Sequence, residues 1–372
     1  MAGANTGKRQ NQERMIQLLR TEQELTKQDI ARRLRLSMPT ALQSINDLID
    51  RGILEECGTL ESTGGRKAKK IRLHREAGLG VGIDIALHHV ELVVTDLLGT
   101  VRFGQTVPLR FRDEPDWYRA LGAALEHFLQ AKQVDSDRIL GVGISFPGII
   151  AGDQIVRSHI FNLAQVGLER FCRHIPYPVA VANDANCACF AELCPERPTY
   201  LYISLNESVG GSLMIENRLL LGDRCQAGEI GHMMLIPGGT RCYCGKPGCA
   251  DAYLSPKVLT GGTRTLEEFF RAVEGGDSEA REQWNRYLEH LAILVTNLRM
   301  LIDIDLILGG EVGKYIPPYL DELCARAARY DRFARDVDYL IPCTRTEHAF
   351  AAGAAMLALE QYGSRLLETQ PK

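Results

Sequence analysis

Three short segments near the N-terminus repeat apolar residues every three or four positions, the spacing of one buried face of an α-helix. The first segment runs from Gln12 to Arg20. The second follows Thr26, whose hydroxyl predicts an N-cap, and the third follows Ser37, which has the same capping chemistry. Gly52 predicts the end of the third segment. The pattern therefore predicts three helices before Gly52.

A basic hairpin is expected to follow these helices. Apolar residues at 53–54 and 71–73 predict its two strands, and residues 63–70 between them place four cations on glycine-containing backbone. Two helices joined by a short turn and followed by such a wing are typical of a winged helix-turn-helix that binds DNA. The alternative is a small protein-interaction module with a solvated basic loop. We expect DNA contacts from the outward side of the third helix and from the wing, at Ser37, Thr40, Gln43, Ser44, Arg66 and Lys67.

From residue 80 onward, several β-rich runs are followed by alternating strands and helices. Strands are predicted at 81–85, 90–95, 101–108, 139–144, 179–181, 200–205, 210–215 and 306–308, and helices at 116–133, after 186, at 290–301 and at 351–362. This order, in two successive blocks, predicts an α/β protein of two lobes with a functional cleft between them. The expected domains are a DNA-binding domain at 1–76, a first lobe at 77–182 plus 346–372, and a second lobe at 183–345.

The composition is that of a soluble globular protein, with 45% hydrophobic and 24% charged residues in a chain of 372. No apolar run has the length of a membrane span, and the polar N-terminus lacks the apolar segment of a secretory signal. The 11 cysteines are odd in number and mostly scattered, so we expect a cytoplasmic protein with no disulfide framework and no membrane partner. The net charge is -4, yet residues 1–76 carry 15 Lys and Arg against 10 Asp and Glu. This local excess favours a polyanion as the partner of the N-terminal domain.

Four side chains able to bind a metal lie close together along the chain: His232, Cys242, Cys244 and Cys249. Three thiols and one imidazole at this spacing fit a closed, tetrahedral zinc site. Glycines in the intervening loop give the backbone the freedom to turn the sulfurs toward one ion. We expect one structural Zn²⁺ per chain, because four protein ligands leave no open position for catalysis.

Four motifs make the chain resemble the ROK family, which contains bacterial sugar kinases and sugar-responsive repressors. The motifs are Asn183-Asp-Ala-Asn186, Gly228-Glu-Ile-Gly-His232, Cys242-x-Cys-Gly-x-x-Gly-Cys249 and Gly309-Gly310. They stand in the order and spacing of the family. The resemblance implies an actin-like (ribonuclease H-like) fold over about residues 78–365. The leading winged helix is similar to that of the repressor branch.

The resemblance also implies a sugar site, lined by Gly148, Asn183, Asp184, Glu229 and His232. Carboxylates, amides and imidazole suit a sugar because each hydroxyl both donates and accepts hydrogen bonds. In a kinase Asp184 would be the catalytic base; the other interpretation of this residue is a helix N-cap.

One further position of the sugar site departs from the family. Asp251 stands where the family normally has a glutamate and is also expected to bind the sugar. Its side chain is one methylene shorter. The sugar could therefore lie closer, a water could intervene, or the contact could be lost.

Both phosphate-binding loops depart further from the family pattern. The kinases have Asp-x-Gly-Gly-Thr after the first strand, whereas this chain has Asp84-Ile-Ala-Leu-His88. The second loop, normally Gly-Thr-Gly-Val-Gly-x-Gly, is Asn206-Glu-Ser-Val-Gly-Gly-Ser212. The lost glycines put β-carbons where phosphate must approach the backbone, and Glu207 adds a like charge that costs about 1 kcal/mol or more. We therefore expect no working ATP cradle.

These observations favour a sugar-responsive, DNA-binding transcriptional regulator that acts as a repressor and has no enzymatic activity. A sugar or sugar derivative would bind between the lobes. The paired heads of a homodimer or homotetramer would bind a pseudo-palindromic DNA operator. Two alternatives stay open: an ATP-dependent sugar kinase of the ROK family, and a module that binds no sugar and whose DNA affinity is set by a partner protein.

Overall fold

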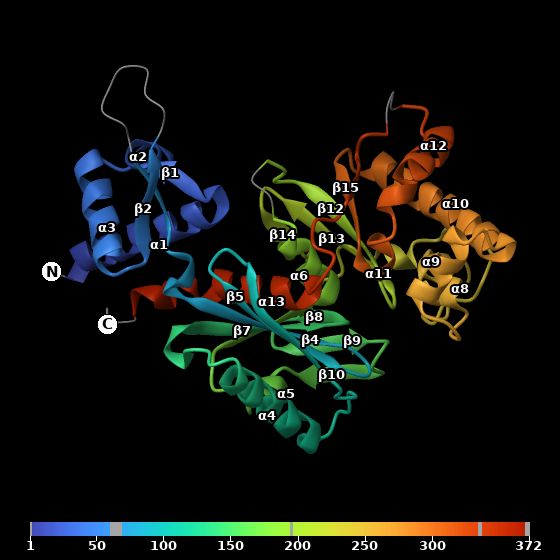
Figure 1. Cartoon of the computed structure of the whole chain (residues 1–372), viewed down its shortest axis with the longest axis horizontal. Helices are drawn as coiled ribbons and strands as arrows, with labels where there is room; N and C mark the ends of the chain where they lie inside the picture. The colour runs from blue at the N-terminus through green and yellow to red at the C-terminus, as the bar shows by residue number, and fades with distance from the viewer. Residues whose placement is uncertain (1, 60–68, 194–195, 334–336, 369–372) are drawn as a thin grey trace. The chain divides into compact units, whose positions relative to one another are not determined.

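The computed structural model describes residues 2–59, 69–193, 196–333 and 337–368, and it divides into two compact units. Unit 1 consists of Met1–Phe146, Leu168–Ala182 and Ala351–Lys372. Unit 2 consists of Pro147–Gly167 and Asn183–Phe350. Figure 1 labels the helices and strands of both units.

The N-terminal part of unit 1 is a winged helix-turn-helix, called the head below (Figure 1). Its elements are α1 (Ala2–Glu22), β1 (Glu24–Thr26), α2 (Lys27–Leu34), α3 (Met38–Asp50), β2 (Leu54–Thr59) and β3 (Lys69–Leu73). Both expected N-caps are confirmed. Thr26 Oγ1 accepts a hydrogen bond from Asp29 N at 3.1 Å, and Ser37 Oγ accepts one from Thr40 N at 3.3 Å. The expected hairpin is also confirmed, since β2 and β3 pair antiparallel; β1 adds an unexpected third strand beside β3.

The head shares one hydrophobic core with the rest of unit 1. Leu97, Leu140, Leu359 and Leu366 pack with the buried leucine, isoleucine and methionine side chains of the head. Burial of apolar area is worth about 25 cal/mol per Å², so a shared core holds the two parts together more effectively than a linker can. The head is therefore attached to the body of unit 1 through packing.

Two arginines of the head add polar contacts to the C-terminal segment, which consists of α13 (Ala349–Tyr362) and η5 (Gly363–Leu367). Arg20 of α1 donates to Glu360 Oε2 at 2.9 Å and to the Met356 carbonyl at 3.3 Å. Arg51, just after α3, donates to the Leu366 carbonyl at 3.0 Å. Segments from opposite ends of the chain thus meet in unit 1.

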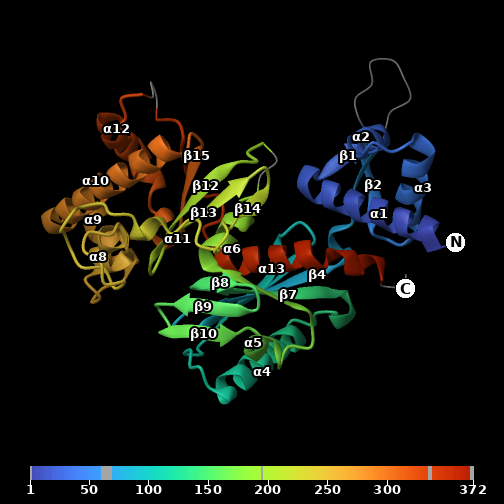
Figure 2. The ribbon, with the colours of Figure 1, turned by 180° about the vertical axis from the view of Figure 1, so that it is seen from behind.

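The body of unit 1 is a five-stranded sheet with the strand order β11-β7-β4-β5-β6. Its elements are β4 (Leu79–Ile85), β5 (Val90–Asp96), β6 (Val101–Val107), α4 (Pro115–Ala131), β7 (Ile139–Phe146), α5 (Glu169–Cys172) and β11 (Val179–Asn183). Figures 1 and 2 show α13 over one face of this sheet and α4 with α5 over the other. Gly82 and Gly143 permit the close approach of α13, because a Cβ at either position would lie 1.8 Å from a carbonyl oxygen of that helix.

Unit 2 contains a second five-stranded sheet, β14-β13-β12-β15-β16, and a small sheet, β10-β9-β8. Its strands are β8 (Ile149–Ala151), β9 (Gln154–Ser158), β10 (Leu163–Gly167), β12 (Tyr200–Leu205), β13 (Val209–Ile215), β14 (Arg218–Leu220), β15 (Asp305–Gly309) and β16 (Leu340–Pro342). Its helices are α6 (Asp184–Ala191), α7 (Asp251–Leu254), α8 (Pro256–Thr260), α9 (Leu266–Glu274), α10 (Ser278–Leu301), α11 (Gly310–Gly313) and α12 (Leu320–Tyr330). Single-turn helices lie at Arg75–Ala77 and Ser136–Arg138 in unit 1, and at Ile230–His232 (η3) and Pro317–Tyr319 in unit 2.

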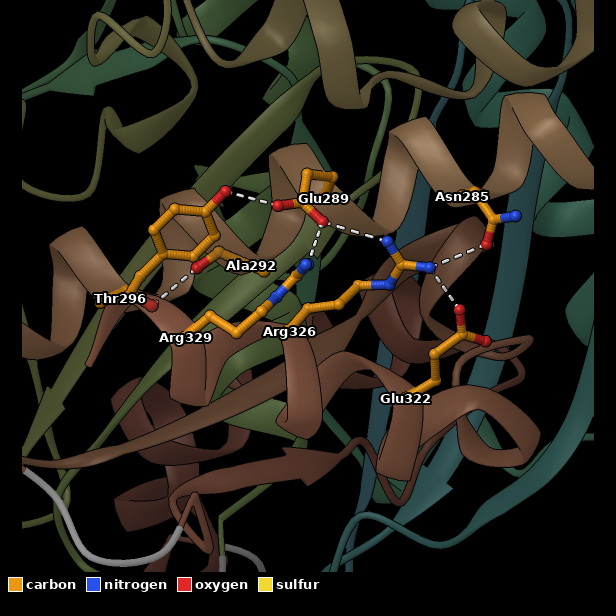
Figure 3. A network of polar contacts seen from close by, with 8 residues as sticks. Asn285, Glu289, Ala292, Thr296, Glu322, Arg326 and Arg329 are labelled. Atoms are coloured by element: carbon orange, nitrogen blue, oxygen red, sulfur yellow. Dashed lines mark hydrogen bonds and ion pairs between the residues drawn. The ribbon is translucent and has the colours of Figure 1, made fainter. Parts of the chain in front are cut away.

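A polar network connects α10 and α12 of unit 2 (Figure 3). Glu289 on α10 accepts hydrogen bonds from Arg326, Arg329 and Tyr330 of α12. Arg326 also donates to Asn285 Oδ1 at 2.8 Å. One carboxylate with three donors is satisfied even though it lies between two helices, so the network fixes the register of these helices.

No helix among the described residues combines the length and the apolar character that a membrane crossing requires.

Arg20→Ala should destabilise the attachment of the head. The Arg20 side chain is only 12% exposed, and its removal takes one donor from the Met356 carbonyl and one from the Glu360 carboxylate. We expect a loss of about 1–3 kcal/mol in the free energy of unfolding, measured by urea titration. Arg9→Ala is the matched control, since the pair of Arg9 with Glu368 is exposed to solvent and should contribute little to the free energy of unfolding. Equal losses in the two variants would contradict the role assigned to burial.

Candidate functional site

A cavity of about 270 Å³ lies within unit 2. Five of the six residues expected at the sugar site line it: Gly148, Asn183, Asp184, Glu229 and His232. They come from segments far apart in the sequence, which the fold brings together. Residues 147–160 reach this cavity because the segment Pro147–Gly167 packs as part of unit 2. The volume is close to the lower end of the range for small-molecule sites and suits a single sugar ring.

Asn183 and Asp184 enter the cavity where β11 ends and α6 begins. Asn183 is the N-cap of α6, because its Oδ1 accepts from Asn186 N at 3.2 Å, while its Nδ2 donates to the Gly148 carbonyl at 3.0 Å. The interpretation of Asp184 as the N-cap is therefore wrong. Burial raises the pKa of Asp184, and hydrogen bonds from the backbone at the start of α6 oppose this shift.

Glu229 and His232 reach the cavity through a tightly packed turn. Gly228 has φ +87°, and a Cβ there would lie 2.2 Å from the Gly211 carbonyl oxygen, so only glycine fits. The single turn η3 then places Glu229 Oε2 4.0 Å from His232 Nε2. Burial raises the pKa of Glu229, and the nearby charge of Asp184 raises it further. Two carboxylates with elevated pKa values thus share the cavity.

The cavity also contains a hydroxyl without a partner. Ser204 Oγ on β12 is buried and makes no hydrogen bond to any described residue. A buried hydroxyl left unpaired costs about 1–3 kcal/mol. Ser204 lines the cavity together with the carboxyl-bearing residues Asp184 and Glu229.

His232, Cys242, Cys244 and Cys249 form a cluster able to hold a metal ion, with ligand atoms all within 4.8 Å of one another. Two spacings within it are 3.8 Å, between His232 Nδ1 and Cys242 Sγ, and 3.7 Å, between Cys244 Sγ and Cys249 Sγ. These distances suit thiolates and an imidazole that converge on one tetrahedral ion. Gly248 makes the loop possible, since its φ is +84° and a Cβ would lie 1.9 Å from the Ile236 carbonyl oxygen. The donor set therefore fits the metal type expected from the sequence.

His232 faces both the metal cluster and the cavity. Its Nδ1 is on the side of the thiols, whereas its Nε2 lies 3.4 Å from the Tyr243 hydroxyl and toward Glu229. A ring nitrogen that binds a metal fixes the orientation of the other nitrogen. The cluster can thus orient one wall of the cavity.

Asp251 is not brought to the cavity. It is 5% exposed, lies outside the lining, and its Oδ1 accepts a hydrogen bond from Val209 N at 2.6 Å. Of the three possibilities left by its shorter side chain, this geometry favours the lost sugar contact. The carboxylate instead holds the turn before β13.

Several lining residues were not expected from the sequence: Arg157, His159, Ser204, Ser208, Cys225 and Tyr243. Tyr243 stands between two metal-ligating cysteines, so the motif itself placed it near the site. His159 lies between β9 and β10, a small sheet whose short strands carry too weak a periodicity for prediction. Neither residue is itself among the expected metal ligands or sugar-binding residues.

Each of the two loops expected to bind phosphate in a kinase has one backbone amide that donates to an acceptor within this chain. In the first loop, Ala86 N donates to the His89 carbonyl at 3.0 Å. In the second, the N–H of Val209 is taken by Asp251, and Glu207 lies 3.7 Å from Lys257 Nζ. Amides committed to internal hydrogen bonds cannot also cradle a phosphate.

The DNA-facing residues expected in the head have mixed outcomes. Ser37, Thr40 and Gln43 are exposed on or just before α3. Ser44 is 2% exposed, so its expected contact with DNA is wrong. Position 44 follows Ala41 by three residues and precedes Leu48 by four, which puts it on the buried stripe of the helix. Arg66 and Lys67 lie outside the described residues.

The fold and the cavity together identify the class of protein. The chain belongs to the ROK family, whose family model matches residues 80–361. The expected fold class is confirmed: an α/β protein in which a winged helix-turn-helix precedes an actin-like ROK domain.

Three relatives illustrate the range of the family. The xylose repressor of Bacillus subtilis (strain 168) is 27% identical over 267 residues, which cover 70% of each chain. The N-acetylmannosamine kinase of Yersinia pestis (strain Pestoides F) is 29% identical over 221 residues, 55% of this chain and 74% of the kinase. A solved ROK family transcriptional regulator, a homolog of the E. coli MLC protein, has a TM-score of 0.78 at 20% identity and covers 97% of this chain and 98% of its own. That similarity in fold includes the head.

Cys249→Ser should remove the bound metal, because three remaining ligands hold an ion far more weakly than four. We expect about one ion per chain in the native protein and a several-fold lower content in the variant after dialysis, measured by atomic absorption. Cys172→Ser, at a half-buried thiol outside the cluster, is the matched control and should keep the metal. Equal metal content in all three proteins would contradict the assignment of the cluster.

Proposed function

We propose that the protein is a sugar-responsive transcriptional repressor without kinase activity. The observation that carries this proposal is a winged helix-turn-helix packed onto a ROK domain whose cavity is polar but whose phosphate loops are closed. The similarity to xylose repressors supports it. The head would bind a DNA operator, and a sugar or sugar derivative in the cavity would change its affinity.

Asp184 and Glu229 are the residues we propose as hydrogen-bond acceptors for sugar hydroxyls. Both line the cavity together with His232, whose Nε2 lies 4.0 Å from Glu229 Oε2. Gly148 and Asn183 would complete the site through backbone and amide groups. A set of acceptors and donors in fixed positions distinguishes sugars that differ at one hydroxyl, because a mismatched group is left buried and unpaired.

The closed phosphate loops argue against the kinase. The Val209 amide donates to the Asp251 carboxylate at 2.6 Å, so it is not free for nucleotide phosphate. Glu207 adds a second negative group to the same loop, 3.7 Å from Lys257. Triphosphate would have to displace one carboxylate and approach another, which disfavours efficient transfer. The similarity to N-acetylmannosamine kinases keeps this activity as the second candidate.

We further propose that the metal is Zn²⁺ with a structural role. Three thiols and an imidazole are soft ligands that favour zinc in a tetrahedral arrangement, and four ligands leave no open position. When bound, the ion would supply rigidity and no reaction step. It would hold the loop that carries Tyr243 and orient His232 toward the cavity.

The partner would be double-stranded operator DNA in the cytoplasm, bound by a homodimer or homotetramer. Two heads related by a twofold axis match a pseudo-palindromic site. The exposed residues Ser37, Thr40 and Gln43 at α3 are the proposed points of contact.

Sugar should change operator affinity, and Asp184→Asn should abolish this response. The substitution keeps the size of the side chain but removes an acceptor, so sugar affinity should fall about tenfold or more. The measurement is fluorescence anisotropy of operator DNA with and without D-xylose or D-glucose, together with a coupled assay for ATP consumption. Sugar-dependent turnover that Asp184→Asn eliminates would establish the kinase instead. Operator binding that no sugar alters would favour a module controlled by a partner protein.

Gln43→Ala should change which operator sequence is preferred, because an exposed amide on α3 can contact base edges. We expect a loss of about 1–3 kcal/mol on the preferred operator and a smaller loss on mismatched sequences. Selection from a randomised duplex library measures this preference. Gln130→Ala, at an exposed glutamine on α4 of the ROK domain, is the matched control and should leave preference unchanged. A uniform loss across all sequences would assign Gln43 to phosphate contact.

A further inference from the structure

Three aromatic rings from separate segments line one side of the cavity. They belong to His159 between β9 and β10, His232 at the end of η3, and Tyr243 in the metal-binding loop. The ring centroid of Tyr243 lies 5.5 Å from that of His159 and 5.3 Å from that of His232, and the centroids of the two histidine rings are 6.2 Å apart. The rings are therefore neighbours that contact one another edge-on or at a tilt, and together they are called the aromatic wall below.

Tyr243 and His159 are both exposed members of this wall, and Tyr243 is also supported by the loop that carries it. Its side chain is 52% exposed, although it sits between Cys242 and Cys244, whose loop is closed by internal backbone hydrogen bonds. Its hydroxyl lies 3.4 Å from His232 Nε2, a long contact that adds little to the support given by the loop. A large aromatic ring held rigidly at a cavity and left open to solvent is typical of a surface that a ligand covers.

The rest of the cavity is polar. The carboxylates of Asp184 and Glu229 and the unpaired hydroxyl of Ser204 supply hydrogen-bonding groups from other segments. A ligand that fits both surfaces has one apolar face and an edge rich in hydroxyls. A pyranose ring has this shape, because its C–H groups gather on the ring faces while equatorial hydroxyls point outward. The weakly positive C–H groups are attracted to the negative face of an aromatic ring.

We propose that Tyr243, flanked by His159, stacks against one face of the sugar ring and makes the site select against pyranoses that carry an axial hydroxyl on that face. This inference rests on the proposed sugar-binding function and adds to it a class of sugar. An axial hydroxyl on the stacked face separates the ring from the aromatic wall and loses the contact. D-Xylose and D-glucose have no such group on either face, apart from the anomeric position.

The test is calorimetric titration of the full-length, metal-loaded protein with two sets of sugars. Each set has an all-equatorial reference, a C2 epimer and a C3 epimer: D-xylose, D-lyxose and D-ribose, then D-glucose, D-mannose and D-allose. The C2 and C3 epimers carry their axial hydroxyls on opposite faces. The aromatic wall would contact only one face of the ring. The wild type should therefore bind one of the two epimers in each set more weakly because its axial hydroxyl lies on that face.

Tyr243→Ala should bind the reference sugar about tenfold more weakly than the wild type does. The ratio of its affinities for the reference sugar and for the rejected epimer should fall several-fold. Tyr243→Phe keeps the ring and should bind within about twofold of the wild type. Phe333→Ala, at an exposed aromatic residue that does not line the cavity, is the matched control and should bind as the wild type does. Metal content is measured in every variant. If Tyr243→Ala loses metal, His159→Ala decides in its place, with an expected loss of about threefold and the same fall in the ratio.

Two results would overturn the stacking proposal while leaving the sugar-binding function intact. One is unchanged affinity and selectivity in Tyr243→Ala, or in His159→Ala where that variant decides. The other is an equal loss in Tyr243→Phe and Tyr243→Ala, which would assign the effect to the hydroxyl. A wild-type protein that binds none of the six sugars would overturn the proposed function itself, and the stacking proposal with it.

Discussion

The candidate site depends on one imidazole that faces two environments. His232 has Nδ1 3.8 Å from Cys242 Sγ, in the cluster able to hold a metal ion, and Nε2 3.4 Å from the Tyr243 hydroxyl. An ion bound there would fix the ring, and the segment from Gly228 to His232 and the loop of the cysteines would keep a common geometry. The polar and aromatic surfaces of the cavity are both fixed relative to this ring. Removal of the metal would therefore loosen the cavity and not only the loop that binds the ion.

The difference between this chain and a sugar kinase lies in hydrogen bonds more than in fold. A carboxylate buried beside β13 needs a donor, and Val209 N–H supplies one to Asp251 at 2.6 Å. The glutamate normally found in the family is one methylene longer. Asp251 stays at the turn, outside the lining of the cavity, and its hydrogen bond occupies an amide of the second loop.

Features set by neighbours in sequence could be predicted, and those set by distant contacts could not. The caps at Thr26 and Ser37 are local hydrogen bonds, and the four metal ligands lie within one short loop and a nearby turn. Ser44 was misplaced because a serine fits equally at the edge of a buried stripe or outside it. The role of Asp251 and the approach of His159 to Tyr243 depend on which segments meet in three dimensions. No periodicity or motif encodes those meetings.

The attachment of the head has a consequence for the spacing of half-sites on DNA. The head connects to β4 through residues 74–78, a stretch that could reach at most about 18 Å, and it shares its core with the body of unit 1. Without a long tether, an assembly of such chains would hold its heads at a separation set by protein packing. Half-sites moved apart by about five base pairs would also rotate by half a helical turn. The strain would then fall on the duplex, which must twist to restore the alignment that the protein cannot supply.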